Sequence, residues 1–424
     1  MPMLLGTKGN DILQWRASAE LVTTLKESLA RNWARSSARE AESFLGQFID
    51  SLQEELSYEA QLAGELASLE EAIDTAGSPG ELQPMQARYK EVVSAHFRRR
   101  QSVLALCGAC NRLHDRVLAK AVTLAKERML KSGRGAAPPH ALLVWGNRGR
   151  REQTLFSENR YLLLHGDASP GLGDFRAQLA GILLEAGLLA NEQMLWHGSA
   201  SEWRAVLEES FPDLERGRQE NLLAPLPPFA APLKQGPLEM PEWGWHLEAM
   251  TDLCFLQGET QLALQALDDT ARAVLQERNR GPFLLLARRA IGLPLAVGHF
   301  GRLRLQRGGE HQGELNLEEL ALSPLVMAMR VLAVHLGIPK GGTVERINAI
   351  LEKGALNVDL AGRLLGAYQC FMQLKIQSEI RSEESGSFCN PEEFDEGMDA
   401  RFRSSVEAVA DLQRIAYQNM VGQV

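Results

Sequence analysis

Apolar residues recur at every fourth position through the first third of the chain. Two such series are Leu21, Leu25, Leu29 and Trp33, and Phe44, Phe48, Leu52 and Leu56. Because residues i and i+4 lie on one face of an α-helix, each series predicts a helix whose apolar stripe packs against other helices. Residues 11–132 are therefore expected to be helical, with a break at residues 77–80 (Gly-Ser-Pro-Gly) and a bend near Gly108.

The pattern changes beyond the loop at residues 133–139. Uninterrupted apolar runs at residues 141–145 and 161–164 predict two buried strands, and a segment rich in glycine and arginine separates them. A further helix is expected at residues 174–189. Two strands and a helix in close succession are typical of a small α/β domain, here with a mixed sheet.

The second half of the chain has mostly helical patterning. Six of the 18 prolines lie in residues 221–242, which predicts an irregular segment there. Helices are expected from Trp245 onward, and an acidic loop at residues 381–399 precedes a last helix at residues 401–420. The predicted fold class is mainly α with a small α/β domain, divided into an N-terminal helical domain (1–112), a central α/β domain (113–280) and a C-terminal helical bundle (281–424).

Composition narrows the class of protein. The 424 residues carry a net charge of −9, so the chain as a whole is a poor binder of nucleic acid or of an anionic membrane. No uncharged apolar run reaches about 18 residues, which predicts no membrane span. Five cysteines are too few for a disulfide framework and fit a reducing cytoplasm. The first six residues are too short and too weakly apolar for a signal peptide.

Candidate chemistry lies between the two predicted strands. Residues 146–155 read Gly-Asn-Arg-Gly-Arg-Arg-Glu-Gln-Thr-Leu. Glycines after a strand let backbone N–H groups approach an anion, and the N-terminus of a following helix would add a favourable dipole. Arg148, Arg150 and Arg151 add positive charge. On these features alone, a surface turn with solvated arginines is the competing interpretation.

The wider segment resembles a bacterial nucleotidyltransferase family related to the N-terminal domain of PII uridylyltransferase. Members typically read Gly-Ser-x-Gly-Arg-x-Glu-Gln-Thr-Leu-x-Thr-Asp-Gln-Asp-Asn, followed by an apolar strand. Seven residues match in register: Gly146, Gly149, Arg150, Glu152, Gln153, Thr154 and Leu155. Similarity continues at 251–259 and through the helical region from Pro294, so it covers about residues 113–420. Relatives often carry cyclic-nucleotide-binding or CBS domains upstream, and residues 1–112 resemble neither.

The resemblance also implies a metal site, and here the sequence departs from the family. Active members place two aspartates as magnesium ligands at the second strand, with a third carboxylate on a later strand. This chain has Glu158 and Arg160 at the first two positions and keeps Asp252 at the third. Arginine cannot ligate a cation, because it accepts no hydrogen bond and stays protonated. The family's Ser, Asn and Arg are replaced by Asn147, Tyr161 and Cys254.

The implied site residues follow from these positions. Catalysis and metal binding would fall to Glu158 and Asp252, with magnesium required only if the protein is active. Contacts to a nucleotide or phosphate would come from Gly146, Asn147, Gly149, Arg150 and Arg160. The implied partners are a nucleoside triphosphate and a protein, with a homo-oligomer also open.

Three functions remain open on the sequence. The first is a degenerate, nucleotide- or anion-binding regulatory module, with Arg160 replacing the charge of a metal. The second is an active transferase that modifies a PII-like protein or a small molecule through Glu158 and Asp252. The third is a purely helical interaction protein. The direction of the Arg160 side chain separates the first two: toward Glu158 and Asp252 in a disabled site, outward in an active one.

A second motif gives weaker evidence for a binding site. Cys107 and Cys110 form a CxxC, and His114 follows on the same helical face. Such a group could hold zinc, but a single pair without a second favours buried apolar cysteines packed in a helix.

Overall fold

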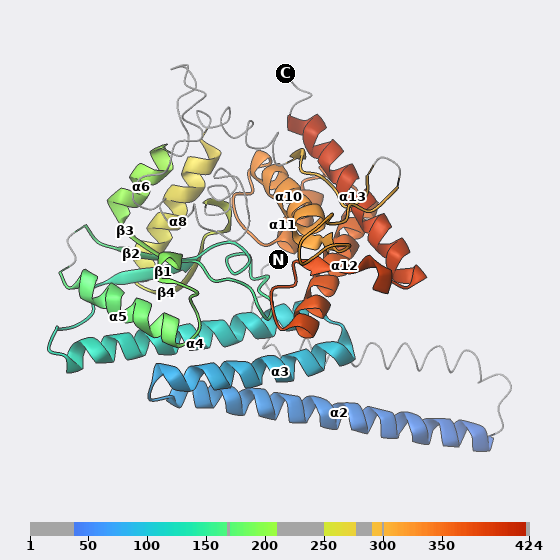
Figure 1. Cartoon of the computed structure of the whole chain (residues 1–424), viewed down its shortest axis with the longest axis horizontal. Coiled ribbons are helices and arrows are strands. Elements are labelled where there is room, and N and C mark those ends of the chain that lie inside the picture. The colour runs from blue at the N-terminus through green and yellow to red at the C-terminus, as the bar shows by residue number, and fades with distance from the viewer. Residues whose placement is uncertain (1–37, 168–169, 210–249, 277–290, 299–300, 421–424) are drawn as a thin grey trace. The chain divides into compact units, whose positions relative to one another are not determined.

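The computed structural model describes residues 38–167, 170–209, 250–276, 291–298 and 301–420 (Figure 1). It divides into two compact units, the first ending at Lys120 and the second beginning at Ala121. The described residues are mainly helical and contain a small mixed sheet, which confirms the predicted fold class. The predicted domain boundaries stay predictions: 112/113 lies inside a continuous helix, and 280/281 lies outside the described residues.

Three long helices account for the first unit, and the last of them continues into the second: α2 (Ala38–Thr75), α3 (Leu82–Arg100) and α4 (Val103–Lys131). The predicted break at residues 77–80 is confirmed, because a short 3₁₀ turn at Pro79–Glu81 separates α2 from α3. The series at residues 21–33 and the proline-rich segment at 221–242 lie outside the described residues. No helix in the described part of the chain is both long enough and apolar enough to cross a bilayer.

The chain also turns at a residue that the sequence analysis did not single out. α4 runs without interruption through Gly108, and the chain turns instead at Gln101, whose φ of 51° is left-handed. The backbone N–H of Gln101 donates to the carbonyl of Phe97 at 2.7 Å and so closes the end of α3. A left-handed residue ends a helix, whereas a glycine inside one only weakens it.

Glycine at position 101 is expected to stabilise the protein. The left-handed conformation costs a residue with a Cβ atom about 1 kcal/mol, and glycine avoids that cost. Gln101→Gly should therefore raise the urea midpoint of unfolding. Gln101→Ala is the matched control, because it also removes the side chain but keeps the Cβ atom. Equal midpoints for the two variants would contradict the argument.

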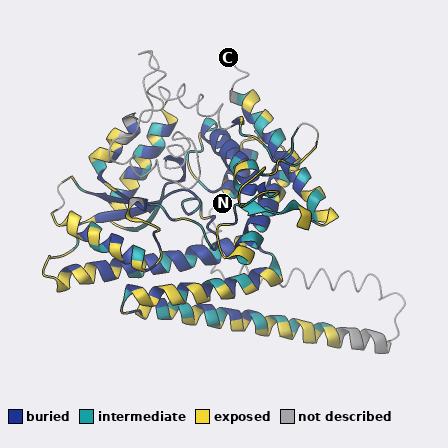
Figure 2. Ribbon diagram, viewed as in Figure 1, coloured by how far each residue is buried: buried dark blue, intermediate teal, exposed yellow. Residues whose placement is uncertain are grey.

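The sheet forms the centre of the α/β region. Its strands are β1 (His140–Val144), β2 (Tyr161–His165), β3 (Leu195–Ser199) and β4 (Cys254–Gly258), in the order β3-β2-β1-β4. β1 is antiparallel to both β2 and β4, whereas β2 and β3 are parallel. Every residue of β1 and β2 is buried, as their uninterrupted apolar runs predict (Figure 2).

Helices cover this sheet. α8 (Thr260–Leu275) and α6 (Ala200–Glu209) lie on one side of it, and α5 (Leu172–Glu185) lies on the other (Figure 1). α5 is the helix predicted at residues 174–189. It ends early because Gly187 takes a left-handed φ of 70°.

Four helices pack together in the C-terminal region: α10 (Ser323–His335), α11 (Thr343–Glu352), α12 (Val358–Ser382) and α13 (Glu396–Met420). A π-helical turn at Glu318–Leu322 leads directly into α10. The acidic segment at residues 381–399 is more ordered than the predicted loop. Within it, β6 (Phe388–Cys389) pairs antiparallel with β5 (Leu315–Asn316), and α13 begins at Glu396 rather than at residue 401.

Candidate functional site

The segment after β1 forms a compact turn and not the expected start of a helix. Gly146 has a left-handed φ of 70° directly after Trp145. The N–H of Arg150 donates to the carbonyl of Gly146 at 3.0 Å, and the N–H of Glu152 donates to that of Asn147 at 2.8 Å. Arg151 is also left-handed, with a φ of 61°, and this prevents the turn from continuing as a helix. The predicted helix dipole is therefore not available at this site.

Gly149 is needed for packing. A Cβ atom at this position would lie 1.9 Å from the carbonyl oxygen of Asp252 and 2.7 Å from the Cα atom of Trp145. Both neighbours are backbone atoms, so neither can move aside as a side chain could. The turn thus lies directly against the chain that leads into β4.

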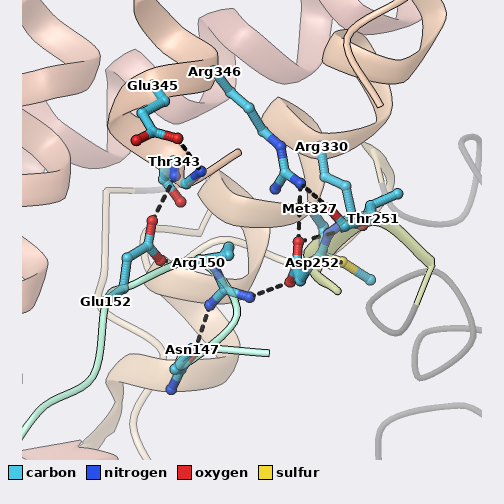
Figure 3. Close-up of polar contacts among 11 residues, drawn as sticks. Asn147, Arg150, Glu152, Thr251, Asp252, Met327, Arg330, Thr343, Glu345 and Arg346 are labelled. Atoms are coloured by element: carbon cyan, nitrogen blue, oxygen red, sulfur yellow. Dashed lines mark hydrogen bonds and ion pairs between the residues drawn. The ribbon is translucent and has the colours of Figure 1, made fainter. Parts of the chain in front are cut away.

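Arg150 connects the turn to Asp252. Its Nη1 donates to Oδ2 of Asp252 at 2.6 Å, and its Nε donates to Oε2 of Glu152 at 2.7 Å (Figure 3). Its Nη2 donates to Oδ1 of Asn147. Arg150 and Asp252 are both buried. The guanidinium of Arg150 therefore fixes the side chains of Asp252, Glu152 and Asn147 relative to one another.

Two further arginines reach Asp252 from the C-terminal helices. Nη2 of Arg330, on α10, lies 2.5 Å from Oδ2, and Nη2 of Arg346, on α11, lies 2.9 Å from Oδ1 (Figure 3). Arg346 also donates to the carbonyl of Thr251 at 2.8 Å. We call Asp252 and the arginines Arg150, Arg330 and Arg346 the Asp252 cluster.

Electrostatics in the Asp252 cluster favour the carboxylate. Burial by itself raises the pKa of Asp252, but the three guanidiniums outweigh burial and hold that pKa well below its usual range. Burial lowers the pKa of Arg346, and the carboxylate of Asp252 opposes that effect. Each charge in the cluster is thus stabilised mainly by its partners, since all four side chains are buried.

Two more residues of the matched motif bind the C-terminal helices. Oε1 of Glu152 accepts the backbone N–H of Thr343 at 2.5 Å, at the start of α11. Glu379 of α12 accepts the Thr154 hydroxyl at 2.6 Å and the Leu155 N–H at 3.0 Å. Burial raises the pKa of Glu379, which is the direction expected for a carboxyl without a fixed ion pair of its own. The motif therefore holds the α/β region and the helices together.

A cavity of about 640 Å³ lies between these two regions of the second unit. Five of the seven predicted site residues line it: Gly146, Asn147, Arg150, Glu158 and Arg160. Gly149 and Asp252 are not among the lining residues. The helical side of the cavity presents residues that the sequence did not single out, among them His311, Asn316, Glu318, Lys375 and Phe388.

The arginine that holds Asp252 is Arg150, whereas Arg160 pairs with Glu158. Nη2 of Arg160 lies 3.6 Å from Oε2 of Glu158 in the cavity wall. The structure therefore brings Arg160 to Glu158 but not to Asp252, which has a separate and buried set of partners, so the expected grouping of all three residues is only half present. Arg150 has the role at Asp252 that the sequence interpretation gave to Arg160.

The residues present do not fit a magnesium ion shared by Glu158 and Asp252. Both carboxylate oxygens of Asp252 already accept guanidinium N–H groups. At 4 Å and an effective dielectric near 20, a divalent cation would be opposed by roughly 8 kcal/mol from each such positive charge. In the described ranges, no group of three or more His, Cys, Asp or Glu side chains is arranged to hold a metal ion.

The cysteine motif lies in α4. Cys107 and Cys110 are both buried and carry free thiols. Nδ1 of His114 lies 2.8 Å from the carbonyl oxygen of Cys110, a contact within the same helix. This geometry is that of packed helical side chains.

One feature of the sequence could have identified Arg330, a residue of the site that the sequence analysis did not name. Arg330 is the single charged residue in the apolar run of residues 324–334, and every residue of that run is buried. A lone charge on a buried helix needs a partner of opposite charge, so the run itself predicts a buried ion pair. No comparable signal marks Arg346 or Phe388, because their surroundings in the sequence are polar.

Comparison with known families agrees with this arrangement. Residues 87–216 match the family model described as "Putative nucleotidyltransferase DUF294", and this range contains the turn and β1 to β3. Residues 281–420 match the model described as "Putative nucleotidyltransferase substrate binding domain", which contains α10 to α13. A search of curated proteins finds no match. The two matches support a nucleotidyltransferase-like protein, with residues 87–216 similar to the first family and residues 281–420 similar to the second.

Proposed function

We propose that this protein is a nucleotide- or anion-binding regulatory module in which metal-dependent nucleotidyl transfer is lost or weakened. The observation that carries the proposal is the Asp252 cluster. The carboxylate expected to ligate a metal is enclosed by three guanidiniums and does not line the cavity. A fixed positive charge can neutralise a phosphate without a metal ion, which supports binding without transfer.

The cavity supports ligand binding. Its volume of about 640 Å³ is in the usual range for small-molecule sites. Arg150 and Arg160 contribute guanidinium groups to its wall, and Asn147 contributes a carboxamide. The guanidinium of Arg150 already donates to Asp252, Glu152 and Asn147. Arginine binds phosphate oxygens through charge-assisted N–H groups, so an anionic group is the natural ligand for Arg160 in this wall.

A second candidate function is transfer of a nucleotide to a PII-like protein or a small molecule. It is favoured by Glu158, whose side chain is 43% exposed and lines the cavity. From the sequence we also propose a relation to PII uridylyltransferase, a protein partner, a homo-oligomer and a cytoplasmic location.

Calorimetric titration of the full chain with ATP and UTP, in magnesium and in EDTA, tests the proposal. We expect a triphosphate to bind in EDTA, with magnesium changing the Kd by less than about threefold. Arg160→Ala should weaken binding roughly tenfold or more, because it removes charge-assisted hydrogen bonds to phosphate. Arg204→Ala is the control, since Arg204 forms an exposed ion pair with Asp269 away from the cavity.

Two results would contradict the proposal. One is tight binding that requires magnesium. The other is release of pyrophosphate from a nucleoside triphosphate that disappears in Glu158→Ala, and this result would favour the active transferase.

A further inference from the structure

Two aromatic rings lie together in the helical wall of the cavity. The rings of His311 and Phe388 are nearly parallel, at an interplanar angle of 7° and a centroid distance of 3.8 Å. Both residues line the cavity. We call this pair the aromatic platform. Neither residue was a candidate on the sequence.

Phe388 is held in place by regular structure, and His311 is held by a side-chain contact in a turn. Phe388 lies on β6, opposite Asn316 on β5, and its carbonyl accepts the hydroxyl of Ser378 on α12 at 2.7 Å. Nδ1 of His311 lies 2.8 Å from a carboxylate oxygen of Glu314. A Cβ atom at Gly386 would lie 2.2 Å from the carbonyl of Lys375, so the loop before β6 fits tightly against α12. Rigid support of this kind lowers the entropy lost when a planar ligand stacks.

The two walls of the cavity differ in charge. The α/β wall contains Arg150, Arg160 and one carboxylate, Glu158. Three carboxylates line the cavity from the helical side: Glu318, Glu319 and Glu384. The one lysine of that lining, Lys375, is paired with Glu318 at 2.7 Å. Phosphate is therefore attracted to the α/β wall and repelled by the helical wall. An uncharged planar group is what the helical wall can accept.

We infer that the aromatic platform binds the base of a nucleotide whose phosphates lie at Arg160 in the α/β wall. Bases stack on aromatic side chains because every base has a π-face. This inference rests on the proposed function and narrows it: the site takes a nucleotide in preference to a polyphosphate without a base.

Titration with two ligands tests the inference on the full chain. ATP has a base and three phosphates, and inorganic tripolyphosphate has the phosphates alone. Phe388→Leu keeps an apolar side chain of similar size but removes the ring. We expect this variant to bind ATP about tenfold more weakly, the loss typical of one stacked base, with the Kd for tripolyphosphate changed less than about twofold.

Two more variants make the result decisive. His311→Ala replaces a half-buried residue in a turn, so it tests the platform even if Phe388→Leu fails to fold. This variant should also weaken the binding of ATP but not that of tripolyphosphate. Phe394→Leu is the matched control, because Phe394 packs against Phe402 and does not line the cavity. It should leave both affinities unchanged.

The possible failures are distinguishable. If the wild-type protein binds tripolyphosphate as tightly as ATP, and the platform variants bind both normally, the inference is overturned while the anion site stands. Equal weakening for both ligands in a platform variant also overturns it. If the wild-type protein binds neither ligand, the proposed function fails and the inference fails with it.

Discussion

Asp252→Asn is expected to lower the free energy of unfolding by about 3–5 kcal/mol. The substitution keeps the shape of the side chain but removes the negative charge between Arg150, Arg330 and Arg346. Three guanidiniums would then lie together in a region without solvent, and breaking one partner of a buried ion group is costly for this reason. Urea unfolding of the full chain, followed by circular dichroism, measures the loss.

Asp268→Asn is the matched control for this experiment. Asp268 also pairs with an arginine, Arg272, at 2.7 Å, but both side chains are about two-thirds exposed. An exposed pair contributes roughly 0–1 kcal/mol, so this variant should unfold almost like the wild type. If Asp252→Asn costs no more than Asp268→Asn, the Asp252 cluster does not stabilise the fold in the way described.

The cluster also predicts how stability depends on pH. Because the pKa of Asp252 is lowered from its ordinary 3.8, its contribution is fully present above about pH 4 and is lost as the pH falls through the lowered value. The difference in stability between wild type and Asp252→Asn should be constant from pH 5 to 7 and shrink in stronger acid. Comparing the two proteins cancels the contributions of other groups to the pH dependence of stability. One such group is Glu379, whose raised pKa changes stability in the opposite direction.

Gly149→Ala is expected to cost at least about 3 kcal/mol of stability. The added methyl group would lie 1.9 Å from the carbonyl oxygen of Asp252, so the turn and the chain before β4 must separate. That movement would also disturb the hydrogen bond from Arg150 to Asp252. Thermal unfolding and urea unfolding of the variant both measure the effect.

Gly181→Ala is the control for this substitution. Gly181 lies within α5, and no heavy atom lies within 4 Å of a Cβ atom placed there. Alanine at such a position should raise stability by about 0.5–1 kcal/mol. A Gly149→Ala variant as stable as the wild type, but weaker in nucleotide binding, would show that the glycine serves the ligand and not the packing.

The local part of this site was predictable from the sequence. Uninterrupted apolar runs identified β1 and β2, and the glycines and arginines between them marked the turn that lines the cavity. These features depend on neighbours within about ten residues, so local patterning carries them. The turn was mistaken for a helix start because a left-handed φ at Arg151, a residue with a Cβ atom, leaves no signal in the sequence.

The long-range part was not predictable in the same way. Arg330 and Arg346 follow Asp252 by 78 and 94 residues, and only the packing of α10 and α11 brings them to its carboxylate. The sequence offered Arg160 as the partner because it occupies the position of a metal-binding aspartate of the family, yet Arg150 makes that contact. His311 and Phe388 meet for the same kind of reason, since pairing of β5 with β6 decides the position of Phe388.

The Asp252 cluster also restricts the order in which its residues can change during evolution. If the aspartate is replaced first, three buried arginines are left without their shared counter-ion. If an arginine is replaced first by an apolar residue, the carboxylate still has two counter-ions. Descendants that abandon the cluster are therefore expected to discard arginines before the aspartate. A lineage that regains a cation-binding carboxylate here must follow the same route, through intermediates with fewer arginines.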